Sequence, residues 1–214
     1  MTDLRYTLIS DGSSDQALIP ILTWLLRENG IRHAVQPYWA DLARLPTPPR
    51  ELREKIIWAV NLYPCNLLFI HRDAETGDRE TRLGEIREAV VEVLARSSIP
   101  PRVCVIPVRM TEAWLLFNEA AIRRAAGNVS GRHILRLPAI GDIENTNDPK
   151  GILYDLLRTA SGLRGRRLRK FSVPYHACRI AGFVGDFSPL RALAAFRCLE
   201  DDLIAIIQEM AWAQ

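Results

Sequence analysis

Lysine is scarce in this sequence, and it contains no long apolar run. Only three of the 28 basic residues are lysines, a bias that by itself identifies no partner. No apolar run approaches the roughly 20 residues that cross a bilayer, and no basic stretch followed by an apolar one begins the chain. We therefore expect neither a transmembrane protein nor a secretory signal, and no membrane partner.

Cysteine is also sparse, and a phosphate-binding loop of the usual ATPase type is missing. The four cysteines are scattered and form no CxxC motif, which argues against zinc and is typical of reduced thiols in a cytoplasmic protein. No GxxxxGK[ST] segment is present, which argues against an ATPase of that class. The 214 residues, 48% of them hydrophobic and 25% charged, suffice for one globular core with a small appendage.

The first half of the chain alternates short apolar segments with amphipathic ones. We predict strands over residues 6–10, 33–39, 66–70 and 102–108, and helices over residues 14–28, 50–61 and 82–97. Ser13 followed by Gln16 fits a capping box at the start of the first helix. An alternating order of strands and helices favours a mostly parallel sheet with helices on its faces.

The second half of the chain changes to a mainly helical pattern. We predict helices over residues 111–127, 148–162 and 188–213, and a basic turn or short helix over residues 163–171. The sequence therefore predicts an α/β core in residues 1–117. It also predicts a helical C-terminal addition in residues 118–214, packed on the core as one unit.

Acidic residues follow three of the four predicted strands. Asp11 comes after the first, Asp73 and Glu75 after the third, and Glu112 after the fourth. Carboxyl ends of parallel strands share one edge of a sheet, and in an extended segment Asp73 and Glu75 would point to the same side. Taken singly, each acid also fits a solvated turn or a helix start, as Asp15 does. Together they favour a site for Mg²⁺ or Mn²⁺.

Positive charge is concentrated in the middle of the second half. Residues 117–180 hold 12 basic and 5 acidic side chains, a net charge of +7, whereas residues 1–116 carry −1 and residues 181–214 carry −3. Five basic residues lie close together here: Arg164, Arg166, Arg167, Arg169 and Lys170. They could follow a nucleic-acid backbone, or form ordinary solvated surface. Phe171 and Tyr175 are candidates for base stacking or for core packing.

Two segments resemble the motifs of the Toprim superfamily. "DGSSDQALIPIL" after a strand is similar to its acid–glycine motif, and "FIHRDAE" to its DxD motif. "RMTEAWLLFN", "NDPKGILYDLL" and "FSPLRALAAFRCLEDDL" are similar to later motifs of a bacterial Toprim-like group, so the resemblance covers nearly the whole chain. Asp11 stands where most Toprim domains have glutamate, and Glu75 replaces the second aspartate of the DxD pair.

The resemblance implies a Mg²⁺-dependent nuclease related to the overcoming-lysogenization-defect enzymes of phage defence, with an ATPase as an expected partner. Asp11, Asp73, Glu75 and Glu112 would be the metal and catalytic residues. Lys150 would contact a phosphate, or would be a solvated lysine at a helix start. Two alternatives stay open. One is a catalytically degenerate Toprim-like subunit that binds or senses, and the other is a phosphotransfer enzyme acting on a small nucleotide.

Overall fold

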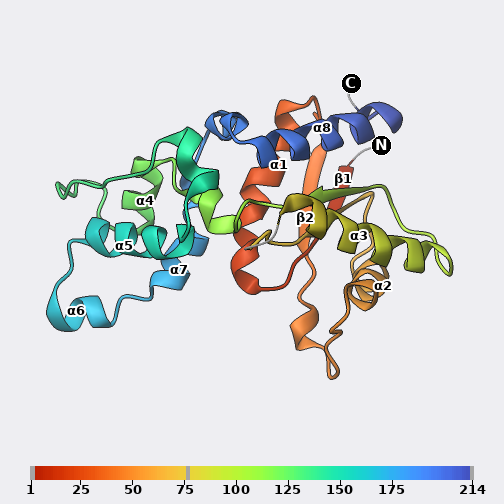
Figure 1. The fold of residues 1–214 in the computed structure, drawn as a ribbon, viewed down its shortest axis with the longest axis horizontal. Helices are drawn as coiled ribbons and strands as arrows, with labels where there is room; N and C mark the ends of the chain where they lie inside the picture. The colour runs from red at the N-terminus through yellow and green to blue at the C-terminus, as the bar shows by residue number, and fades with distance from the viewer. Residues whose placement is uncertain (1–2, 76–77, 213–214) are drawn as a thin grey trace.

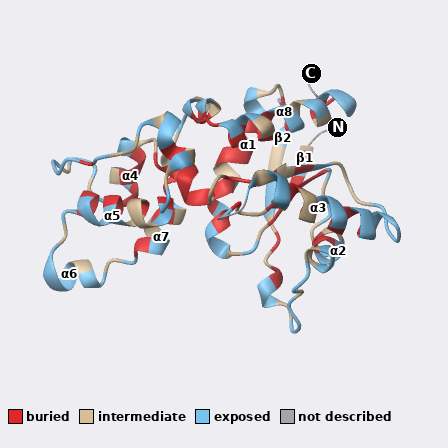
Figure 2. Ribbon diagram, in the orientation of Figure 1, coloured by how far each residue is buried: buried red, intermediate tan, exposed pale blue. Residues whose placement is uncertain are grey.

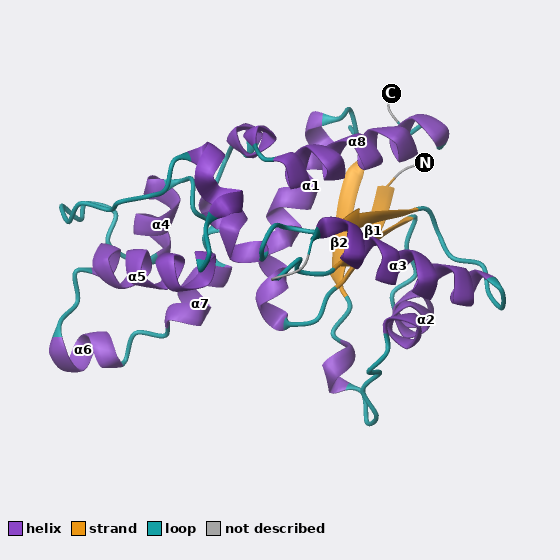
Figure 3. Ribbon diagram, viewed as in Figure 1, coloured by secondary structure: helices purple, strands orange, loops and turns teal. Residues whose placement is uncertain are grey.

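The computed structural model describes residues 3–75 and 78–212, which form an α/β core beside a group of helices (Figures 1 and 3). The strands are β1 (Asp3–Ile9), β2 (Ala34–Trp39), β3 (Leu67–His71) and β4 (Arg102–Val105). The helices of the core are α1 (Leu18–Glu28), α2 (Leu52–Leu62), α3 (Arg79–Leu94) and α8 (Ala194–Glu209). The helical part contains α4 (Glu119–Ala125), α5 (Pro149–Ser161), α6 (Gly165–Arg169) and α7 (Val173–Cys178). Short 3-10 helices include η1 (Ser13–Ala17), η2 (Leu42–Arg44), η3 (Thr111–Leu115), η4 (Ile140–Asn145), η5 (Ala181–Phe183) and η6 (Ser188–Ala192).

The four described strands form one parallel sheet in the order β2-β1-β3-β4. In the register of the sheet Ile9 pairs with Ile70, and His71 pairs with Val105. The carboxyl ends of β1, β3 and β4 are therefore level with one another. This confirms the predicted α/β class with a mostly parallel sheet flanked by helices.

Strand β3 is buried on both faces, whereas the edge strand β2 is exposed or half-buried. Figure 2 shows in red the buried segments of α1, which packs on one face of β3. Leu67 and Phe69 face the core that α1 and α8 complete, whereas Leu68 and Ile70 face the core formed with α2 and α3. This alternation places His71 on the same face as Leu67 and Phe69. The last residue of β3 is thus directed toward the layer that contains η1 and α1.

Two of the predicted helices are interrupted, and in each case a side chain caps the second piece. The helix predicted over residues 111–127 divides into η3 and α4, because the Asn118 side chain accepts a hydrogen bond from Ala121 N at 2.9 Å. The helix predicted over residues 188–213 divides into η6 and α8. Here the Glu144 carboxylate accepts hydrogen bonds from Ala194 N and Ala195 N at 3.0 and 2.8 Å.

The start of the first helix also differs from the prediction. Residues 13–17 form the 3-10 helix η1 before α1 begins. The residue that caps it is Asp15, whose Oδ2 accepts a hydrogen bond from Gly12 N at 3.0 Å, so the pairing predicted for Ser13 and Gln16 is wrong. Asp15 is thereby fixed as a buried acid at the sheet edge.

The buried core is continuous from the sheet into the helical part. One apolar cluster contains residues of β1, β3 and α1 together with residues of α5, α7 and α8, and α8 packs against β4. In Figure 1 the chain returns along α8 to the sheet, close to its beginning. The division at residue 117 stays a prediction. Over residues 3–75 and 78–212, no helix is both long and apolar enough to cross a membrane.

Candidate functional site

The carboxyl edge of the sheet is held together beyond the strands by backbone hydrogen bonds. Ala74 N donates to Pro107 O at 3.2 Å, and Glu75 N donates to Arg109 O at 2.6 Å. The loop after β3 is thus attached to the segment that leads from β4 to η3. Side chains from these two stretches, which lie far apart in sequence, are placed beside each other.

His71 connects three elements at this edge. Its side chain is only 1% exposed, and its Nε2 lies 3.1 Å from Asp73 Oδ1 and 3.1 Å from Thr111 Oγ1. On the other side of the ring, Nδ1 lies 3.5 Å from Asp15 Oδ2 without hydrogen-bond geometry. The ring therefore links η1, the loop after β3 and η3, and two carboxylates face it from opposite sides.

Asp73 is fixed through one of its two carboxylate oxygens. Its Oδ1 accepts from Thr111 N at 2.9 Å and from Thr111 Oγ1 at 3.4 Å, in addition to its contact with His71. Within the described ranges all side-chain contacts of Asp73 fall on Oδ1, and the side chain is 30% exposed. Oδ2 is thus available to a ligand from an orientation that the protein has already set.

Glu112 and Lys150 form an ion pair next to Asp73. The Glu112 side chain is 10% exposed, and Lys150 Nζ lies 3.0 Å from its Oε1. Burial acts against the charge of Lys150, but the hydrogen bond and charge of Glu112, with further contributions from Tyr154 and Asp73, raise its pKa above the ordinary value. The negative charge of Glu112, with a smaller contribution from Asp73, thus keeps Lys150 positively charged.

Asp11 and Glu75 have other partners. Asp11 contacts Lys55 Nζ at 2.6 Å and Arg72 Nε at 3.5 Å. Burial opposes the change, but the hydrogen bond and charge of Lys55, with the charge of Arg72, lower the pKa of Asp11 below its ordinary value. Glu75, paired with Arg82 at 2.8 Å, is 65% exposed.

The extended segment predicted for residues 73–75 is not present. Glu75 has a φ of 55°, in the left-handed region, so the alternation that would align its side chain with that of Asp73 is lost. Among the described residues no three His, Cys, Asp or Glu side chains are grouped closely enough to hold a metal ion. The four carboxylates predicted as one metal shell are thus not assembled as one group.

A smaller metal site remains consistent with the donor chemistry. Mg²⁺ keeps several waters and is usually bound by one or two carboxylates together with substrate phosphates, so it does not require three protein ligands. Asp73 and Glu112 are candidates for such a pair, because Asp73 accepts a hydrogen bond from Thr111, the residue before Glu112. Lys150 forms an ion pair with Glu112, and the charge of Asp73 makes a smaller contribution to its pKa.

The predicted nucleic-acid residues lie in a different part of the molecule. All five basic side chains lie on or next to helix α6 and are exposed, and none forms an ion pair with another described residue. They are Arg164, Arg166, Arg167, Arg169 and Lys170. Figure 1 shows α6 at the end of the helical part that is remote from the sheet. Nearby, Phe171 stacks on His176 with ring centres 4.1 Å apart, and Tyr175 is exposed.

Asp15 and Thr111 were missed as site residues. The sequence pattern places Asp15 in the first turn of a helix, where acidic residues are common. Nothing in the sequence shows that Asp15 is buried against His71. One signal was present: Asp15 lies four residues after Asp11, within a single polar segment that follows a strand. The burial of His71 is consistent with a structural role for this histidine.

No family model matches the chain, and neither does any curated protein or solved structure.

Asp15→Ala is expected to lower the free energy of unfolding by about 1–2 kcal/mol, because Gly12 N loses its acceptor and His71 loses a facing carboxylate. Urea unfolding followed by circular dichroism measures this loss. Asp15→Asn keeps an oxygen acceptor and should lose less than half as much. The exposed Asp155→Ala serves as a control and should change stability by no more than about 0.5 kcal/mol. Equal midpoints for Asp15→Ala and the wild type would contradict the structural role of this acid.

Proposed function

We propose that this protein is a divalent-metal-dependent phosphodiesterase that hydrolyses phosphodiester bonds in DNA or RNA. The observation that supports it most is the state of Asp73. One of its oxygens is fixed by Thr111 and His71, and the other has no side-chain contact with the described residues, near the ion pair of Glu112 and Lys150. This combination of oriented carboxylates and an ammonium group at a strand edge suits a metal-bound phosphate.

Asp73 and Glu112 would hold Mg²⁺ or Mn²⁺. When bound, such an ion polarises a phosphoryl oxygen and makes the attacking water more acidic. His71 orients Asp73 from behind, and Lys150 supplies positive charge for a phosphate oxygen. We assign no proton transfer to Asp11, because its lowered pKa makes it a weaker base.

The exposed basic residues around α6 would bind the nucleic-acid backbone at a distance from the reacting phosphate. Arginine side chains without internal partners are available to phosphates and release counterions when they bind them. Helix α5 begins at the candidate site and leads toward α6 (Figure 1). A nucleic-acid strand that lies along the helical part could therefore reach both the candidate site and α6.

Asp73→Asn is expected to reduce cleavage in Mg²⁺ or Mn²⁺ by at least about 10²-fold while leaving folding intact, because the amide keeps the oxygen that Thr111 and His71 contact but loses the charge. Cleavage of plasmid, single-stranded DNA and RNA, with and without EDTA, measures the effect. The matched control is Asp155→Asn, an exposed acid on α5 that should cleave like the wild type. Unchanged cleavage by the Asp73 variant would remove this residue from the mechanism.

Replacing Arg164, Arg166 and Arg167 by alanine is expected to weaken nucleic-acid binding and to reduce the slope of log K against log salt concentration by roughly 2–3, because three phosphate contacts are lost. Fluorescence anisotropy over a range of salt concentrations measures the slope. The control replaces three exposed arginines of the core: Arg50, Arg96 and Arg102. The same slope in the triple variant and the wild type would show that the basic segment is ordinary surface.

A second candidate is a Toprim-like subunit that binds nucleic acid, or a partner such as an ATPase in phage defence, without catalysis. The observation that favours it is that each of the four predicted carboxylates lies against a basic side chain or His71. Metal-dependent cleavage of any nucleic acid by the wild type, abolished in Asp73→Asn, would exclude this candidate.

A further inference from the structure

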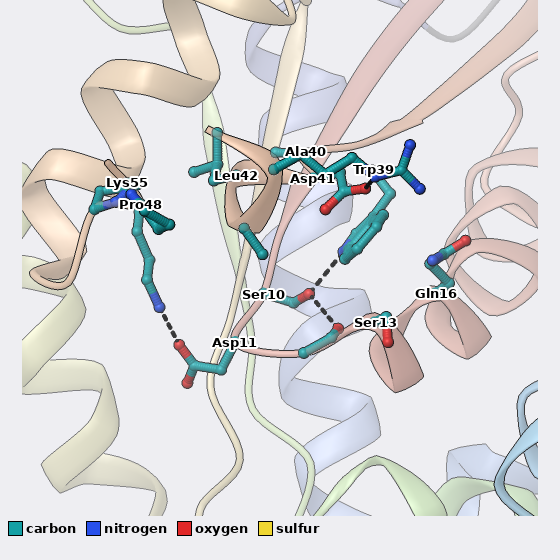
Figure 4. A pocket seen from close by; sticks show the side chains of 14 residues that line it. Ser10, Asp11, Ser13, Gln16, Trp39, Ala40, Asp41, Leu42, Pro48 and Lys55 are labelled. Atoms are coloured by element: carbon teal, nitrogen blue, oxygen red, sulfur yellow. Dashed lines mark hydrogen bonds and ion pairs between the residues drawn. The ribbon is translucent and has the colours of Figure 1, made fainter. Parts of the chain in front are cut away.

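A cavity lies beside the acidic edge, at the carboxyl ends of β1 and β2. Its volume is about 630 Å³, within the range of sites that bind small organic ligands. Figure 4 shows Lys55 and Asp11 on one side of this cavity, and Trp39, Gln16 and Ser13 on the other. Residues 40–44, which include η2, also line it, together with Pro48 and Pro49.

The charges in this cavity are already neutralised by one another. Lys55 Nζ lies 2.6 Å from Asp11 Oδ1, and Arg44 Nε lies 2.6 Å from Asp41 Oδ2. A ligand carrying a net charge would compete with these pairs for the same side chains. The cavity therefore suits an uncharged group better than a phosphate.

The other residues that line the cavity provide an apolar indole surface and polar side chains that have no hydrogen-bond partner among the described residues. The Trp39 indole is held in place, because its Nε1 donates to Ser10 Oγ at 2.9 Å. The Gln16 amide and the Ser13 hydroxyl, both exposed, have no hydrogen-bond partner among residues 3–75 and 78–212. An amide offers a donor and an acceptor together, which is the pattern needed to read the edge of a nucleobase.

The position of the cavity on the sheet relates it to the reacting phosphate. It lies over the ends of β1 and β2, whereas Asp73 follows β3, the next strand in the sheet. Neighbouring strands are about 4.8 Å apart, so the cavity and the loop that contains Asp73 are at adjacent positions along the sheet edge. A nucleotide adjoining the cleaved bond can span these two positions.

We propose that this cavity binds the base of a nucleotide next to the cleaved phosphodiester, and that Gln16 discriminates among the bases. This inference rests on the proposed function and adds a specificity subsite to it. The phosphates of the nucleic-acid strand would be bound by the metal site and the basic segment, and the base would be bound by this cavity, whose charged side chains are paired.

The test compares the binding of five pentanucleotide probes in EDTA, where no cleavage occurs. Four are the homopolymers of the four DNA bases, and the fifth is an abasic pentamer with the same phosphates, which isolates the contribution of the bases. We expect the wild type to bind at least one homopolymer about fivefold or more tightly than the abasic probe. Gln16→Ala should remove most of the difference between homopolymers, because one base-reading hydrogen bond is worth about five- to tenfold in affinity, and it should leave abasic binding unchanged.

Gln208→Ala, an exposed glutamine on α8, is the matched control and should behave like the wild type. Equal binding of homopolymers and the abasic probe by the wild type would overturn the inference, and so would an unchanged base preference in Gln16→Ala. If either result accompanies cleavage that depends on Asp73, the proposed function stands and the subsite alone is wrong. If the wild type binds none of these probes and also fails to cleave plasmid, single-stranded DNA and RNA in Mg²⁺ or Mn²⁺, both proposals fail.

Discussion

The parallel register of the sheet is the constraint on which the rest of this structure depends. Because β1, β3 and β4 end level with one another, the short segments that follow them meet at one edge. His71, the last residue of β3, then joins those segments through contacts with Asp15, Asp73 and Thr111. A buried imidazole between two carboxylates fixes the local backbone more narrowly than apolar packing would, because a polar group buried without a partner costs free energy.

The acidic edge is balanced by positive charge within the protein itself. Asp11, Glu75 and Glu112 each lie against a lysine or arginine, and the raised pKa of Lys150 reflects its position beside two acids. Such pairing lets carboxylates gather at one edge without mutual repulsion. It also sets a condition on the proposed chemistry, since a metal ion or a phosphate must compete with these pairs. The edge thereby has acids beside β3 and β4, and a cavity at the ends of β1 and β2 whose charged side chains are paired.

The fold was largely readable from the sequence, whereas the site was readable only in part. Apolar alternation and helical periodicity identified the strands and helices, because those patterns come directly from burial. The interruption at Asn118 was missed because capping competes with an otherwise continuous helical pattern. The grouping of four acids was predicted from strand order alone. Strand order does not indicate that Glu75 adopts a left-handed backbone conformation, or that Lys55 of α2 and Lys150 of α5 pair with Asp11 and Glu112. Asp15 was overlooked because its burial arises from tertiary packing against His71.

We propose that Asp73 and Glu112, rather than all four predicted acids, form a divalent-cation site. Titration with Mn²⁺, followed by the loss of the free-ion signal in electron paramagnetic resonance, tests it without reference to activity. We expect the wild type to bind one Mn²⁺ per chain, with Asp73→Asn and Glu112→Gln weakening the affinity by about tenfold or more. Asp11→Asn and Glu75→Gln should change the affinity by less than about twofold. Absence of Mn²⁺ binding by the wild type, or equal weakening by all four substitutions, would contradict the account.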